Sequence, residues 1–99
     1  MIIVHIKHFL NQQGEEYFGK WVSEVADILS DFKGFISLEI IEEIDEASES
    51  QLLLRFEDEP LLRKWADSPE HDALVSKLFP YQLKPYSSQT YQVKQSFDD

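Results

Sequence analysis

Three histidines are the side chains of this sequence that are best suited to proton transfer: His5, His8 and His71. An ordinary imidazole titrates near a pKa of ~6.5, so each can accept or donate a proton at neutral pH. His71 precedes Leu74 and Val75 by about one helical turn, which predicts a place on the inner face of a helix. It is a candidate general base at the mouth of a pocket, or a hydrogen-bonded structural histidine.

The other two histidines lie in an N-terminal stretch that alternates like a β-strand, so they point to opposite faces. His5 shares its face with Lys7, whose positive charge favours a neutral imidazole. A neutral imidazole suits a general base, although the same placement fits ordinary packing. His8 lies on the other face near the end of the strand, where we expect a surface residue.

Tyrosine hydroxyls are the candidate donors to a bound oxyanion. Tyr81, Tyr86 and Tyr91 all lie in the C-terminal fifth of the chain. Phenols in a last strand also serve as interface residues, so this alternative remains open.

Other kinds of site lack the residues that they need. The sequence contains no Cys, which excludes disulfides, thiolate chemistry and Cys-ligated metals. No pair of histidines has a metal-binding helical spacing, and three isolated glycines cannot build a phosphate loop or a dinucleotide fingerprint. We therefore expect no metal site and no cofactor.

The charge of the chain argues against polyanionic partners. Nineteen Asp and Glu against nine Lys and Arg give a formal net charge of −10 at pH 7. Such a surface repels nucleic acids and anionic membranes, and its simplest use is solubility. No apolar run approaches the ~18 residues of a membrane span, and the N-terminus lacks the basic segment of a signal peptide. We expect a cytoplasmic protein.

Hydrophobic periodicity predicts the elements of the first half of the chain. Residues 2–9 alternate as a strand, Asn11 to Gly14 break it, and a helix follows, with Glu15 and Glu16 in its first turn and Gly34 as its C′ residue. Three- and four-residue steps place its apolar face at Tyr17, Phe18, Trp21, Val22, Val25, Ile28, Leu29 and Phe32. A second strand is predicted over residues 35–44.

The second half repeats this order. An acidic loop at residues 45–50 precedes a strand over residues 51–57, and Asp58 with Pro60 begins a helix. Ser68 and Pro69 start a second helical segment, and residues 86–95 form a fourth strand. We assign residues 1–96 to one domain and residues 97–99 to a tail.

The order strand, helix, strand, strand, helix pair, strand predicts an α+β, ferredoxin-like βαββαβ fold, with an antiparallel four-stranded sheet and helices on one face. The uniformly apolar positions face the helices: Ile2, Val4, Ile6, Ile36, Leu38, Ile40, Leu52, Leu54 and Phe56. The opposite face mixes apolar and polar residues: Ile3, His5, Lys7, Phe9, Phe35, Ser37, Glu39, Ile41, Leu53 and Arg55.

The mixed face carries too many large apolar groups for a sheet open to water. A second copy that covers it forms a dimeric α/β barrel with a partly polar interior. On this face we expect Glu39 opposite Arg55, as a cross-strand ion pair.

Residues 55–71 resemble the antibiotic-biosynthesis-monooxygenase family. In that family a strand ends in an apolar–aromatic pair, and a Trp on the next helix, here Trp65, precedes a small polar residue that opens another turn. Phe32-Lys33-Gly34-Phe35 resembles the family's glycine at the start of the second strand. The similarity extends over nearly the whole chain, and its diagnostic parts are Gly34 and the stretch from Trp65 to His71.

The resemblance implies a homodimer with one pocket per subunit between the sheet and the helices. Several members are monooxygenases without metal or organic cofactor, whose electron-rich phenolic or quinol-type substrate is deprotonated and then reacts with dioxygen itself. The protein supplies a dry pocket, a base and an oxyanion stabiliser. The candidate residues here are His71 and His5 as catalytic bases, and Trp65, Phe9, Phe35 and Arg55 as substrate-binding residues.

Other members of the family degrade haem, and the sequence disfavours that activity. The haem-degrading branch keeps an Asn on the first strand and a haem-ligating His about three turns after the Trp. Here the first strand offers His5, Lys7 and His8, and Val75 occupies the position of the ligand. His71 remains an alternative ligand.

The leading hypothesis is therefore a homodimeric, cofactor-independent monooxygenase acting on a small aromatic or quinone-like ligand. The rival is a non-catalytic ligand-binding or interaction module, in which side chains fill the shared barrel and the acidic outer surface meets a partner. For Trp65, a place in the core is the alternative to a pocket wall.

Overall fold

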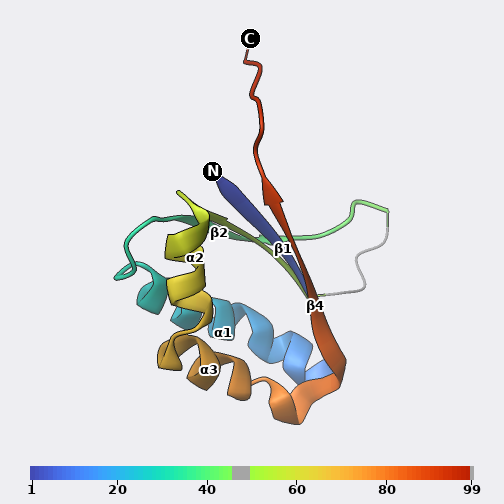
Figure 1. Ribbon diagram of the computed structural model, residues 1–99. Helices are drawn as coiled ribbons and strands as arrows, with labels where there is room; N and C mark the ends of the chain where they lie inside the picture. Colours follow the sequence, from blue (N-terminus) through green and yellow to red (C-terminus); the bar gives the residue numbers. More distant parts are fainter. Residues whose placement is uncertain (46–49, 99) are drawn as a thin grey trace.

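The computed structural model describes residues 1–45 and 50–98, and Figure 1 shows the path of the chain. The first half contains β1 (Ile2–Leu10), α1 (Gln12–Leu29) and β2 (Phe35–Ile41). The second half contains β3 (Ser50–Phe56), α2 (Glu59–Ala66), α3 (Pro69–Ser76), a 3₁₀ turn at Phe79–Tyr81, and β4 (Gln82–Gln92).

The four strands form one antiparallel sheet in the order β2-β3-β1-β4, and the helices lie on one of its faces (Figure 1). The central strand β1 sets the register, since Ile6 lies between Leu52 of β3 and Ser88 of β4. The predicted α+β ferredoxin-like fold is confirmed.

The start of α1 differs from the prediction. The helix begins at Gln12, directly after β1, because the side chain of Asn11 caps it by accepting a hydrogen bond from the Gly14 amide at 2.9 Å. The strand ends before Asn11 as expected, but residues 12–14 already belong to the helix, so α1 turns back at once over the end of β1. Gly34 is not the C′ residue, since α1 ends at Leu29; its φ of +90° belongs to the turn into β2.

The predicted apolar stripe of α1 forms the centre of the core. Phe18, Trp21, Val22, Val25 and Leu29 are buried against the sheet. They pack with apolar residues of the other elements, which are Ile2, Val4, Leu10, Leu52, Leu54, Phe56, Trp65, Leu74 and Leu78.

The faces of β2 depart from simple alternation because the strand carries a register shift between Phe35 and Ser37. Phe35, predicted on the mixed face, instead packs on the helix side with its ring centroid 6.2 Å from that of Phe56. Ile36 and Ile40 were predicted to face the helices and are exposed, at 47% and 54%. Ile36 lies within the shift, and β2 is an edge strand of the sheet.

The two short helices begin at the predicted caps. The Asp58 carboxylate accepts a hydrogen bond from the Leu61 amide at 3.0 Å, and the Ser68 hydroxyl accepts one from the His71 amide at 3.1 Å. Pro occupies the first turn of each helix. The second cap fixes His71 in the first turn of α3.

The bounds of β2 and β4 also differ from the prediction. β2 ends at Ile41 rather than at residue 44, and β4 spans Gln82–Gln92 rather than residues 86–95. Most of the predicted acidic loop, residues 46–49, lies outside the described residues, as does Asp99 of the predicted tail. The boundary at residue 96 stays a prediction.

The open face of the sheet, opposite the helices, carries the mixed set of side chains. Glu39 lies opposite Leu53 and not opposite Arg55, which pairs with Ser37. The expected ion pair nevertheless forms, because the Arg55 guanidinium reaches the Glu39 carboxylate along the diagonal.

Candidate functional site

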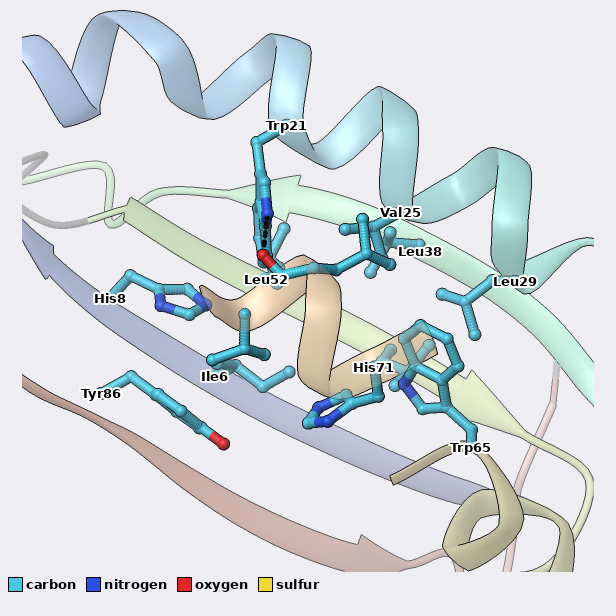
Figure 2. A pocket seen from close by; sticks show the side chains of 13 residues that line it. Ile6, His8, Trp21, Val25, Leu29, Leu38, Leu52, Trp65, His71 and Tyr86 are labelled. Atoms are coloured by element: carbon cyan, nitrogen blue, oxygen red, sulfur yellow. Dashed lines mark hydrogen bonds between the residues drawn. The ribbon is translucent and has the colours of Figure 1, made fainter. Parts of the chain in front are cut away.

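A pocket lies between the helix-covered face of the sheet and the three helices, and every layer of the fold contributes to it. Figure 2 shows its lining, which includes Ile6 and His8 of β1, Trp21 of α1, Trp65 of α2, His71 of α3 and Tyr86 of β4. The inner part has a volume of about 40 Å³ and is otherwise lined by aliphatic side chains. It is a mostly apolar space with few polar groups, as ligand pockets commonly are.

The pocket widens toward β4 into a mouth of about 230 Å³. Trp65, His71 and Tyr86 border both parts, whereas Ser88 and Thr90 border only the mouth. These two residues of β4 are exposed on the helix side of the sheet. The pocket is therefore dry inside and wet at its entrance.

Trp65 and His71 form one wall. Their rings meet edge to face with centroids 5.2 Å apart, and Phe32 packs on the other side of Trp65 at 5.1 Å. His71 Nδ1 is buried and has no hydrogen-bond partner among the described residues; Asp72 Oδ1, at 3.7 Å, is too distant. The His71 side chain as a whole is 24% exposed, so the ring also reaches solvent.

A buried hydrogen bond joins α3, the helix that carries His71, to α1. The indole nitrogen of Trp21 donates to the carbonyl oxygen of Leu74 at 2.7 Å (Figure 2, dashed line). Lys77 and Glu24 add an exposed ion pair between the same two helices at 2.9 Å. These contacts hold His71 against the pocket.

His8 is the second imidazole of the pocket and is only 2% exposed, so the prediction of a surface residue is wrong. Its ring packs against the rings of Phe18, Trp21 and Tyr86, with centroids 5.9, 5.3 and 5.1 Å away. Burial lowers the pKa of His8 from 6.5 to about 4, because the charged form loses its hydration. The side chain is neutral at pH 7.

Comparison with known proteins identifies the family. The sequence matches the model of the antibiotic biosynthesis monooxygenases over residues 1–77. The chain belongs to this family. No curated protein matches the sequence.

Several solved structures share this fold at low sequence identity. A protein from Deinococcus radiodurans superposes with a TM-score of 0.86 at 9% identity, covering 100% of this chain and 98% of its own. A conserved protein from Methanosarcina mazei gives 0.82 at 17% identity, covering 94% and 92%. A variant of SnoaB, a cofactor-independent oxygenase from Streptomyces nogalater, gives 0.80 at 12% identity, covering 99% and 97%. At these identities the likeness concerns the fold alone.

In this family member, the structure brings together two of the six residues predicted for the site. Trp65 and His71 line the pocket, whereas His5, Phe9 and Arg55 point from the open face of the sheet. Phe35 lies on the helix side but packs against Phe56 and does not line the pocket.

The residues on the open face have partners of their own. His5 Nε2 lies 2.7 Å from Oε1 of Gln51, and the ammonium group of Lys84 lies 4.2 Å from the centre of the Phe9 ring. A separate hollow of about 240 Å³ borders His5 and Lys7 on this side. Within one chain, the sheet separates His5 from His71.

Sequence reasoning missed His8 as a pocket residue and weighed Tyr86 mainly as an interface residue. The sequence did indicate the side of the sheet on which His8 lies, because His8 alternates in phase with Ile2, Val4 and Leu10 of β1. That alternation carries His8 to the helix side as long as the strand continues to residue 10.

The described residues offer neither a metal centre nor a membrane-spanning helix. Residues 1–45 and 50–98 contain no group of three or more His, Cys, Asp or Glu that could hold a metal ion. None of the helices in these ranges has the length and apolar composition that a membrane crossing needs. The groups at the pocket that can exchange protons or form hydrogen bonds with a ligand are two imidazoles and a phenol, set in an apolar wall.

Proposed function

We propose that this protein is a cofactor-independent monooxygenase that acts on a small aromatic or quinol-type substrate in the pocket between the sheet and the helices. The observation that carries the proposal is an apolar pocket in which an accessible imidazole, His71, stands beside an indole wall, Trp65. Membership of the antibiotic biosynthesis monooxygenases and the shared fold with SnoaB, a cofactor-independent oxygenase, support the reaction class.

His71 is the proposed general base. Its ring borders both the inner pocket and the mouth, within reach of a ligand hydroxyl. Because Nδ1 is buried, Nε2 is the atom that takes the proton. Its partial exposure lets the proton pass on to water. Trp65 provides a flat apolar surface for an aromatic ring, and the Tyr86 hydroxyl, which points into the pocket in Figure 2, stabilises the oxyanion.

The reaction needs no reductant besides the substrate. His71 removes the phenolic proton, and the resulting anion places electron density on a ring carbon that carries one hydrogen. That carbon bonds to dioxygen, and the peroxide takes a proton back from His71. The O–O bond then breaks as the carbon loses its hydrogen. One oxygen atom remains as a carbonyl and the other leaves as water, so the four electrons gained by dioxygen all come from the substrate.

The proposal includes a homodimer that covers the open face. That face carries Ile3 and Leu53, both half-buried, and the half-exposed Tyr91 lies opposite Ile3. A second sheet over these side chains would bury them, and the hollow beside His5 would then lie inside the shared barrel. The role of His5 as a second base stays a prediction of this arrangement.

The alternative function is a non-catalytic module that binds a small ligand or a partner protein. The size of the inner pocket favours it, because about 40 Å³ is far below the ~150 Å³ of a cavity that encloses benzene. On our proposal the aromatic ring of the substrate occupies the wider mouth, and only a substituent enters the inner part.

The deciding experiment measures dioxygen consumption with a panel of hydroxyanthrones and hydroxynaphthalenes, together with mass analysis of the products. Replacing His71 by Ala is expected to lower kcat by about 10²- to 10⁴-fold, the usual contribution of a general base. Lys64→Ala, an exposed position on α2, is the matched control with full activity. Equal turnover by wild type and His71→Ala would refute the role of His71, and no turnover of any substrate would favour the binding module.

A further inference from the structure

His8 is a buried polar side chain that has no hydrogen-bond partner among residues 1–45 and 50–98. Among the described residues neither ring nitrogen forms a hydrogen bond, and Nδ1 is fully shielded from solvent. Buried polar groups in folded proteins are nearly always paired, so an exception calls for an explanation. A histidine at this position is less favourable for folding than an apolar residue of the same shape.

The residues around His8 pack against its ring but form no hydrogen bond with it. Phe18 and Trp21 of α1 and Tyr86 of β4 surround the imidazole with aromatic faces and edges. Three packed rings leave the imidazole little freedom to turn, which fixes the direction of its nitrogens. A rigid, unpaired donor–acceptor group is what a ligand-recognition site requires.

The two imidazoles of the pocket lie apart and differ in environment. Figure 2 shows His8 toward one end and His71 toward the other, with Ile6 between them. Ile6 and His8 are alternate residues of β1, so they stand about 7 Å apart along the strand. An aromatic ring lying over Ile6 therefore has His71 at one edge and His8 at the opposite edge.

The volumes of the two parts of the pocket agree with this placement. The mouth of about 230 Å³ borders Ile6 and His71 but not His8, whereas the inner part of about 40 Å³ borders all three. A single hydroxyl or carbonyl group fits the inner part, because a water molecule needs only ~10–15 Å³ by the same measure. The ring stays in the mouth and one oxygen reaches inward.

We infer that the pocket recognises an aromatic ligand with oxygen substituents at two opposite edges, one hydrogen-bonded to His8 and the other facing His71. Because Nδ1 is shielded, Nε2 is the nitrogen that meets the ligand. Nε2 of a neutral imidazole is a donor in one tautomer and an acceptor in the other, so it can bind either a carbonyl or a hydroxyl group. The inference rests on the proposed function only for the reacting hydroxyl at His71. It narrows the substrate class to phenols with a second oxygen across the ring system, and it makes His8 a specificity-determining residue.

The test compares two probes that differ by one oxygen, 2-naphthol and 2,6-dihydroxynaphthalene, by calorimetric titration of wild type, His8→Phe and His8→Gln. We expect the wild type to bind the diol about 3- to 10-fold more tightly, after correction for its two equivalent orientations, as one neutral hydrogen bond predicts. In His8→Phe this preference disappears, because the second oxygen has no hydrogen-bond partner at position 8. His8→Gln, which keeps a donor and an acceptor, retains part of the preference.

Three results would overturn the inference: equal affinities in the wild type, a preference that survives in His8→Phe, or no binding of either probe to the wild type. A purely structural His8 predicts that His8→Phe is less stable and leaves the preference unchanged. Dioxygen consumption, measured on the same samples, separates this inference from the proposed function. A lost preference in His8→Phe without turnover by any variant refutes the oxygenase and leaves the recognition by His8 standing.

Discussion

The pH dependence of folding is the most direct physical test of the environment of His8. The side chain is 2% exposed, and its pKa falls from 6.5 to about 4 on folding. Between these two values the unfolded chain binds a proton at His8 and the folded chain does not. Acidification in this range therefore favours the unfolded state.

The size of the effect follows from the same two values. Each unit of pKa difference corresponds to about 1.4 kcal/mol, so His8 makes the folded state about 3 kcal/mol less stable below pH 4 than above pH 6.5. Most of this loss, about 2 kcal/mol, falls between pH 7 and pH 5. Domains of this size are stable by only about 5–15 kcal/mol, so the loss is measurable.

The assay is urea unfolding followed by circular dichroism at pH 7 and pH 5, for the wild type and for His8→Phe. We expect the wild type to lose about 2 kcal/mol more than the variant over this interval. The many carboxylates of the chain titrate in both proteins, so their contribution cancels in the difference. His8→Phe at pH 7 is expected to be as stable as the wild type or more stable, because no unpaired polar group remains.

Parallel pH profiles of the two proteins would refute the reasoning. They would mean that His8 titrates near its ordinary pKa, and hence that the ring is hydrated or paired in solution. A steeper loss in the variant than in the wild type would contradict the sign of the effect. Either result would also remove the neutral, buried imidazole on which ligand recognition by His8 depends.

Two further predictions concern the helices and the turn that surround the pocket. Gly34→Ala is expected to destabilise the fold by about 1–3 kcal/mol, because φ is +90° and the new Cβ would lie 2.6 Å from Cδ1 of Leu61. Gly19 is exposed in α1, and a Cβ there would meet nothing within 4 Å beyond its own helix backbone, so Gly19→Ala should stabilise the fold by up to ~1 kcal/mol. Thermal unfolding of both variants checks this contrast. Trp21→Phe removes the buried hydrogen bond to the Leu74 carbonyl, so amide exchange in α3 should accelerate by about 10-fold or more, while unchanged α3 exchange would show that this bond does not hold the helix.

The fold was predictable because local signals and the global pattern agree. The apolar stripe of α1 and the caps at Asp58 and Ser68 depend on residues close together in sequence, and the structure confirms each of them. The errors arose where one residue changes the register. The shift after Phe35 moved that side chain to the other face, which no alternation pattern reveals in advance.

The pocket was less predictable because its polar residues depend on contacts between distant elements. His71 was identified from helical spacing, but His8 was misplaced because it lies near the end of its predicted strand, just before the expected break at residues 11–14. In the structure Asn11 caps α1, which begins within two residues of β1. Phe18 and Trp21 of α1 therefore lie against His8.

The two imidazoles of the pocket are chemically different because the helices cover the sheet unevenly. Near His8, α1 lies directly over β1 and excludes water, so the ring stays neutral and serves as a fixed hydrogen-bonding group. Near His71, the pocket opens beside the exposed Ser88 and Thr90 of β4, so a proton taken from a ligand can leave to solvent. A base must exchange protons with water after each turnover, whereas a recognition group works best when it cannot change its charge. On the proposed function, the opening along β4 therefore assigns catalysis to His71 and ligand selection to His8.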